Sequence, residues 1–229
     1  MALPSSSPDG RRLRSERTRQ TIMEAYIELL RERPEIPTAA QIAARAGFST
    51  RSIFERFVDL QGLSLATVDY AFAMGEAQAV ARNVDGDRAT RLQSHVETRA
   101  QTCERWLPVW RVVVANQGKL DDLRVRIRFI RQSIVKRMEL MYRPELEVLS
   151  AEERRDLLIA LESLIDFESW GRMREGHGLS FEEACSVWVR MIDRMLPPTP
   201  PARPSAPIRR RPGPLASMAA ACAASGPSN

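Results

Sequence analysis

The chain has 229 residues, of which 44% are hydrophobic and 28% charged, so its composition excludes a disordered or fibrous protein. Its net charge of +5 is uneven: residues 1–58 carry a net +3, residues 59–196 a net −2 and residues 197–229 a net +4. Both ends could therefore approach a polyanion, although charge alone does not identify the partner.

Cysteine and histidine are distributed in a way that argues against metal and redox chemistry. Cys103, Cys185 and Cys222 have neither the even number of a disulfide framework nor the short spacing of a zinc site, and the two histidines, His95 and His177, lie far from them. We expect reduced thiols, no metal and no cofactor. The sequence shows no signal peptide and no apolar stretch long enough for a membrane, so the expected location is the cytoplasm.

The first predicted helix follows a Ser/Pro-rich, then basic arm at residues 1–14, which we expect to be flexible. Apolar residues between Ile22 and Leu30 recur at the spacing of one helix face. Pro34 disfavours continuation, so the helix is predicted over residues 15–33.

Two shorter helices are predicted next. Thr38 followed by Gln41 has the spacing of a capping box and predicts a helix over residues 39–45. Gly47 is the residue type that ends a helix in a left-handed turn. Ser49 can then cap a third helix that runs to about residue 57.

Longer helices are predicted between residues 59 and 196. Apolar stripes and capping boxes place them over residues 63–81, 88–117, 121–142, 150–175 and 180–196. From residue 197 onward the sequence is rich in proline, alanine and arginine, which predicts a disordered tail over residues 197–229. The triplet Arg209–Arg211 could add nonspecific DNA affinity or be a solvated, inactive segment.

The stretch from Thr38 to Phe57 has the spacing of a helix-turn-helix. Two closely crossing short helices need a small residue where they meet, which Ala43 supplies. The turn needs a residue that tolerates positive φ, and Gly47 stands four places later. Ile53, six places after the glycine, is apolar and can pack back onto the first helix. A helical hairpin in an ordinary all-α core is the alternative.

In a helix-turn-helix, the first side chains of the second helix face base edges in the major groove. Arg51 can read guanine with two N–H groups, while Thr50 and Ser52 can bond bases or phosphates. The capped helix ends at Thr38 and Ser49 suit phosphates. The candidate DNA-binding residues are Thr38, Ser49, Thr50, Arg51, Ser52, Phe54 and Arg56.

Residues 15–63 resemble the DNA-binding head of the TetR family of bacterial regulators. The segments that carry the resemblance are Arg17-Thr-Arg-Gln-Thr-Ile-Met-Glu-Ala, Ile42-Ala-Ala-Arg-Ala-Gly-Phe-Ser, Ile53-Phe-Glu-Arg-Phe and Leu63. The resemblance implies an all-α homodimer in which each head reads one half-site of a near-palindrome. It also implies a variable C-terminal domain that binds a small molecule and releases the DNA.

Two positions depart from the pattern of that family. The family usually has tyrosine where this chain has Phe54, and lysine where it has Leu60, and both usual residues bond phosphates. Histidine is common where Arg56 stands, so Arg56 could restore part of the phosphate contact. Phe54 can pack but cannot donate a hydrogen bond.

The helices after residue 59 offer candidates for a ligand site and a dimer interface. The resemblance implies that the last two helices form a four-helix bundle with a second copy; an intramolecular core is the alternative. The candidate dimer residues are Leu161, Ile165, Trp170, Trp188 and Ile192. The candidate ligand residues are Trp106, Trp110, Phe129 and Met138, although aromatic and Met residues at helical spacing also suit simple core packing.

The sequence therefore predicts an all-α protein with a helix-turn-helix head at residues 15–58 and a larger helical ligand-binding and dimerisation domain at residues 59–196. We expect a homodimeric transcriptional regulator, a repressor, that binds double-stranded DNA and is released by a small-molecule effector. The alternative is a helical interaction module that binds DNA without operator specificity. No spaced nucleophile, metal set or phosphate loop favours an enzyme.

Overall fold

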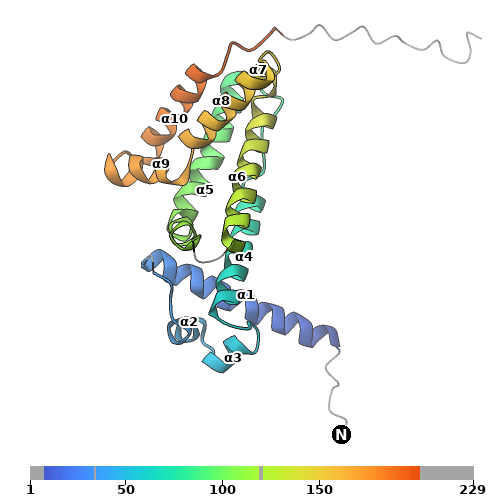
Figure 1. The fold of residues 1–229 in the computed structure, drawn as a ribbon, viewed down its shortest axis with the longest axis vertical. Coiled ribbons are helices and arrows are strands. Elements are labelled where there is room, and N and C mark those ends of the chain that lie inside the picture. The colour runs from blue at the N-terminus through green and yellow to red at the C-terminus, as the bar shows by residue number, and fades with distance from the viewer. Residues whose placement is uncertain (1–7, 34, 119–120, 202–229) are drawn as a thin grey trace, which may run out of the picture. The chain divides into compact units, whose positions relative to one another are not determined.

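Helices are the only regular secondary structure in the part of the chain that the computed structural model describes, which is residues 8–33, 35–118 and 121–201 (Figure 1). The all-α prediction is therefore confirmed. The first helices are α1 (Pro8–Glu32), α2 (Ala39–Ala46), α3 (Thr50–Phe54) and α4 (Leu60–Gln78). The later helices are α5 (Arg88–Asn116), α6 (Asp121–Met141), α7 (Arg143–Leu146), α8 (Ala151–Leu164), α9 (Phe167–Gly171), the π-helical turn η1 (Arg172–Gly176) and α10 (Phe181–Met195).

The predicted caps hold the first short helices in place. The Thr38 hydroxyl accepts from the backbone N–H of Gln41 (3.3 Å), whose side chain accepts from the N–H of Thr38 (2.8 Å). Gly47 has a φ of 73° and donates its N–H to the carbonyl of Ala43. Ser49 caps α3 by accepting from the N–H of Ser52 (3.2 Å). The turn between α2 and α3 is thus set by local hydrogen bonds.

The helices α1, α2 and α3 pack around fully buried side chains. Ile22, Ile42 and Ile53, one from each helix, are 0% exposed. Figure 1 shows α2 and α3 together on one side of α1. Arg45 of α2 forms ion pairs with Glu28 (3.4 Å) and Glu32 (2.8 Å) of α1.

The helix α5 lies at the centre of the larger helical region. It contacts α1, α4, α6, α9 and α10, and its buried side chains extend over most of its length. Pro108 lies inside α5 without ending it. One hydrophobic core continues from α1 through α4 and α5 to α10, because α1 packs against α4 and α5 as well as α2.

The largest differences from the predicted helices concern the start of α1, the interruption between α8 and α9, and the short helix α7. The first helix begins at Pro8 and not at residue 15, so residues 8–14 of the expected arm are helical. The single helix predicted over residues 150–175 is wrong, because Asp166 interrupts it and caps α9 by accepting from the N–H of Glu168 (2.6 Å). The helix α7 was not predicted.

The end of α10 is held by polar contacts from α5. Arg88 donates to Asp193 (2.7 Å) and to the carbonyl of Pro197 (2.5 Å). The arginine triplet Arg209–Arg211, and most of the predicted disordered tail, lie outside the described residues.

Candidate nucleic-acid interface and internal cavity

The first turn of α3 presents polar side chains to solvent. Thr50 and Arg51 are exposed, and Ser52 is half-buried. The side chain of Arg51 is 88% exposed, and among the described residues it forms one hydrogen bond, to Glu55 one turn later (3.0 Å). A surface pair of this kind costs little to break, so Arg51 can turn to a base edge.

The two capping residues, Thr38 and Ser49, also lie at the surface. The Thr38 hydroxyl donates to the side chain of Gln41 (2.9 Å) while it accepts from the backbone N–H of the same residue. The Ser49 hydroxyl acts as an acceptor for Ser52 and donates to no described residue. Ser49 therefore keeps a donor that suits a phosphate oxygen, whereas the donor of Thr38 is already used.

Phe54 and Arg56 differ in how they meet solvent. Phe54 is 48% exposed, so its ring lies partly in solvent at the end of α3. Arg56 turns back onto α3, where it donates to the carbonyl of Ser52 (2.9 Å), and its buried Nε has no partner among the described residues. In this conformation Arg56 does not reach outward as the sequence led us to expect.

The N-terminal half of α1 carries a basic surface on a segment that the sequence analysis treated partly as a flexible basic arm. Arg12, Arg14 and Arg17 are exposed along it, and Figure 1 shows this half of the helix extending beyond α2 and α3. Its helical conformation was not predicted, because the segment lacks the apolar stripe by which a helix is usually located. Because these arginines lie on a helix, their charges have fixed positions relative to the rest of α1.

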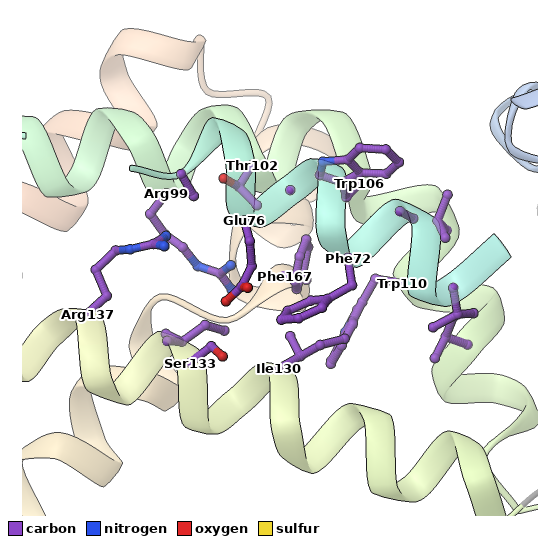
Figure 2. A pocket seen from close by; sticks show the side chains of 17 residues that line it. Phe72, Glu76, Arg99, Thr102, Trp106, Trp110, Ile130, Ser133, Arg137 and Phe167 are labelled. Carbon is purple, nitrogen blue, oxygen red and sulfur yellow. The ribbon is translucent and has the colours of Figure 1, made fainter. Parts of the chain in front are cut away.

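A cavity of about 90 Å³ lies between α4, α5 and α6 (Figure 2). Its lining is mainly apolar and aromatic, with charged and hydroxyl groups toward one end. The lining residues are Val68, Ala71, Phe72, Gly75, Glu76, Ala79, Arg99, Thr102, Trp106, Val109, Trp110, Val113, Ile130, Ser133, Ile134, Arg137 and Phe167.

Two arginines supply the positive charge of this cavity. Arg99 is 7% exposed; its Nε donates to the carbonyl of Ile165 (2.9 Å), and its guanidinium carbon lies 4.5 Å from the centroid of the Phe167 ring. Arg137 is half-buried, and its pKa is lowered by burial, with Glu76 opposing that effect and Arg99 adding to it. No carboxylate of the described residues lies within 4.0 Å of either guanidinium.

Two of the four predicted ligand residues line the cavity and two do not. Trp106 and Trp110 line the cavity. Phe129 does not: it is 53% exposed and packs edge-to-face on Phe72, with ring centroids 5.4 Å apart. Met138 is 0% exposed and belongs to the hydrophobic core. The stripes of α5 and α6 were visible in the sequence, but which side of each stripe faces a cavity depends on how the two helices are rotated against each other.

A second cavity of about 260 Å³ lies between α1, α4 and α5. Tyr26 of α1 and Leu60 of α4 are among its lining residues. Val68, Val109 and Val113 line both cavities, so these three side chains form a common wall. A change in the volume of the first cavity would therefore act on the side chains that support α1.

The predicted dimer residues are wrong for an interface, because all five are buried inside the chain. Leu161, Trp170, Trp188 and Ile192 are 0% exposed and Ile165 is 1% exposed. The rings of Trp170 and Trp188 pack on each other with centroids 4.9 Å apart. The stripes that these residues form pack into the intramolecular core, which was the alternative interpretation of the sequence.

Two further features concern the described residues only. No group of three or more His, Cys, Asp or Glu side chains is arranged to hold a metal ion there. Among the same residues, every helix is too short or too polar to cross a membrane.

Comparison with known proteins identifies the fold. No protein-family model matches the sequence, and no curated protein does. A TetR-family transcriptional regulator from Streptomyces coelicolor superposes with a TM-score of 0.67 at 15% identity, covering 79% of this chain and 80% of its own. A transcriptional regulator from Rhodococcus sp. Rha1 gives 0.63 at 14% identity, covering 80% of this chain and 99% of its own.

A third solved structure is the multidrug binding protein EbrR in complex with imidazole. It superposes with a TM-score of 0.55 at 16% identity, covering 90% of this chain and all of its own. At these identities the likeness establishes the fold: the chain has the helical architecture of TetR-family regulators.

Proposed function

We propose that the protein is a sequence-specific DNA-binding transcriptional regulator that acts as a homodimer in the cytoplasm and has no catalytic activity. The observation that carries the proposal is the first turn of α3. There the left-handed Gly47 and the Ser49 cap orient the helix so that Thr50 and Arg51 project into solvent. Its fold is that of solved transcriptional regulators, which supports the same function.

The geometry favours recognition of bases by α3 and contacts from the residues around it to the phosphates of the DNA. Arg51 is free to bond guanine with two N–H groups, and Ser49 keeps a donor for a phosphate. The exposed arginines of α1 supply positive charge that Arg56, turned inward, does not. These arginines are our explanation of how the head compensates for Phe54 and Leu60.

A homodimer would place two heads on the two halves of a near-palindrome. The helices α8 and α10 contact each other, and each keeps a face that is not buried within the chain. The exposed residues on these faces are Asp156, Ile159, Ala160 and Ser163 of α8, and Ser186, Arg190 and Arg194 of α10. We propose that two copies pair through these outer faces.

The cavity between α4, α5 and α6 suits an effector that releases the DNA, so the protein would act as a repressor. Its wall of Val68, Val109 and Val113 is shared with the cavity under α1. A ligand that moves this wall would shift α1 and α4, and with them the α3 helix. A shift of the heads relative to each other would disfavour simultaneous binding to both half-sites.

Selection of bound sequences from random double-stranded DNA tests the function. We expect a palindromic consensus and an affinity that falls about 10³- to 10⁵-fold between 50 and 200 mM salt, as for ~6–10 phosphate contacts. Salt-sensitive binding without a consensus would favour the alternative, an interaction module that binds DNA nonspecifically. No binding at low salt would contradict both.

A further inference from the structure

The cavity between α4, α5 and α6 is small and largely aromatic. Its volume of about 90 Å³ is below the roughly 150 Å³ of a cavity that holds benzene, so a single ring enters only when the side chains of the walls move apart, and larger ligands are disfavoured. Phe72, Trp110 and Phe167 line it from three helices, and the last two stack with centroids 4.8 Å apart. Such walls favour a flat, apolar ring.

The polar end of the same cavity is positively charged. Figure 2 shows Arg99 of α5 and Arg137 of α6 reaching toward this end, where Glu76 of α4 also points. Glu76 is exposed, and neither it nor any other described carboxylate lies within 4.0 Å of either guanidinium. Two arginines against one carboxylate leave a net positive charge in the lining.

An unpaired guanidinium that is shielded from water is costly, and an anion that enters the site removes that cost. Arg99 is 7% exposed, and its one hydrogen bond to a described residue, through Nε, leaves both terminal nitrogens to donate elsewhere. Arg137 has no hydrogen-bond partner among the described residues. The two side chains together offer several N–H donors in the planar arrangement that matches a carboxylate.

We propose that this cavity binds a small aromatic carboxylic acid, with the ring against Phe72 and Trp110 and the carboxylate bonded by Arg137 and Arg99. Ser133 and Thr102, which also line the cavity, can bond a ring hydroxyl or the second carboxylate oxygen. The inference names the effector class of the regulator proposed above and rests on that proposal for its biological role, but not for the binding itself.

Calorimetric titration of the purified, DNA-free protein with benzoate, benzylamine and benzyl alcohol tests the proposal. The three probes share one ring and differ in charge. We expect benzoate to bind, with quenching of tryptophan fluorescence because Trp106 and Trp110 line the site. Benzyl alcohol and benzylamine should bind at least about tenfold more weakly, since each lacks the charge-assisted bonds.

A pair of matched variants on α6 locates the site. Arg137→Leu removes the guanidinium from the cavity and should weaken benzoate binding about tenfold or more. Arg128→Leu makes the same change on an exposed arginine of the same helix that does not line the cavity, and should leave binding within about twofold. If Arg137→Leu does not fold, Arg137→Gln, which keeps a polar stem, should show the same loss.

Three results would overturn the proposal. Benzylamine could bind as tightly as benzoate or more tightly, which would make Glu76 the anchor. Arg137→Leu and Arg137→Gln could leave benzoate binding unchanged, or none of the three probes could bind. Because DNA is absent from the titration, these results are independent of whether a palindromic consensus is found. If the selection from random DNA gives no palindromic consensus but benzoate still binds, the proposed function is contradicted and the proposed ligand class is not.

Discussion

His95 is buried on α5, 3% exposed, with its Nδ1 2.5 Å from the hydroxyl of Tyr142. Burial, together with the positive charges of Arg99 and Arg137, lowers the pKa of His95 to about 3. The ring is therefore neutral in the folded protein at neutral pH, and Tyr142 donates to it.

This depressed pKa predicts a pH-dependent stability. The unfolded chain takes up a proton on this histidine below about pH 6.5, whereas the folded chain does so only near pH 3, so folding weakens as the pH falls between those values. From pH 7 to pH 5 the contribution is about 2 kcal/mol. Urea unfolding at both pH values should show that His95→Gln loses this difference.

The matched control for that measurement is His177→Gln. His177 is the second histidine of the chain and is exposed. Its variant should keep the pH dependence of the original protein. A His95→Gln protein with an unchanged pH dependence would show that other groups account for the acid sensitivity.

Arg51 is the residue on which base recognition depends most directly in the proposed function. Its side chain is 88% exposed and forms a surface ion pair with Glu55, so Arg51→Ala should leave the fold unchanged. We expect a loss of about 1–3 kcal/mol in operator binding and relaxed preference at one base pair of each half-site. Selection of bound sequences by the variant measures both.

Arg128→Ala serves as the comparison for Arg51→Ala. Arg128 is exposed on α6 and carries the same charge, but it lies on another helix and outside the proposed dimer faces of α8 and α10. It should alter neither affinity nor consensus. A general loss of affinity in both variants would mean that net charge, and not base reading, is being measured.

The exposure of Thr50 and Arg51 could be predicted from the sequence, whereas the directions of most candidate residues after residue 59 could not. The exposure of Thr50 and Arg51 follows from local caps and from the spacing of Ala43, Gly47 and Ile53, all within a few turns. The directions of Phe129, Met138 and Trp188 depend on packing between distant helices. An apolar stripe looks the same in a sequence whether it faces a cavity, a core or a second chain.

The turn between α2 and α3 is the element on which the orientation of the proposed recognition helix depends. Gly47 has a φ of 73°, and a Cβ added there would meet no atom within 4 Å. Any cost of Gly47→Ala therefore comes from the backbone alone, about 1–2 kcal/mol for a left-handed alanine. Denaturant unfolding should show this loss, with weaker DNA binding.

Gly176→Ala is the control for the unfolding experiment on Gly47→Ala. A Cβ at Gly176 also meets no atom within 4 Å, but its φ is not positive. The change should be neutral or slightly stabilising, because alanine restricts the unfolded chain. Equal destabilisation by both substitutions would contradict the backbone explanation.

Predicted and observed elements diverge where a tertiary contact competes with local pattern. The apolar stripe continued through residues 150–175, yet the chain breaks at Asp166. The break exposes the carbonyl of Ile165, to which Arg99 donates (2.9 Å). Asp166 was a signal that could have been used, since aspartate prefers the start of a helix to its interior.

Assembly belongs to the scale of the whole molecule. If two copies pair through the outer faces of α8 and α10, a long charged side chain at Ala160 should separate them, because it would be buried in the bundle without a partner. Light scattering is expected to give a dimer for the original protein and a monomer for Ala160→Arg, with unchanged helix content.

Ala77→Arg provides the reference for that experiment, since Ala77 is exposed on α4 and not on the proposed face. It should remain dimeric. A dimer that survives Ala160→Arg would place the contact elsewhere, and an original protein that is already monomeric would contradict the proposed assembly.

The wall of Val68, Val109 and Val113 between the two cavities has a thermodynamic consequence. If filling one cavity weakens operator binding by some factor, then operator DNA must weaken effector binding by that same factor, because both routes connect the same four states. Bound operator DNA would therefore lower the affinity for the aromatic acid as much as the bound acid lowers the affinity for DNA. The concentration of effector needed for release would then rise with the affinity of each operator, so that one regulator could set different thresholds at different genes.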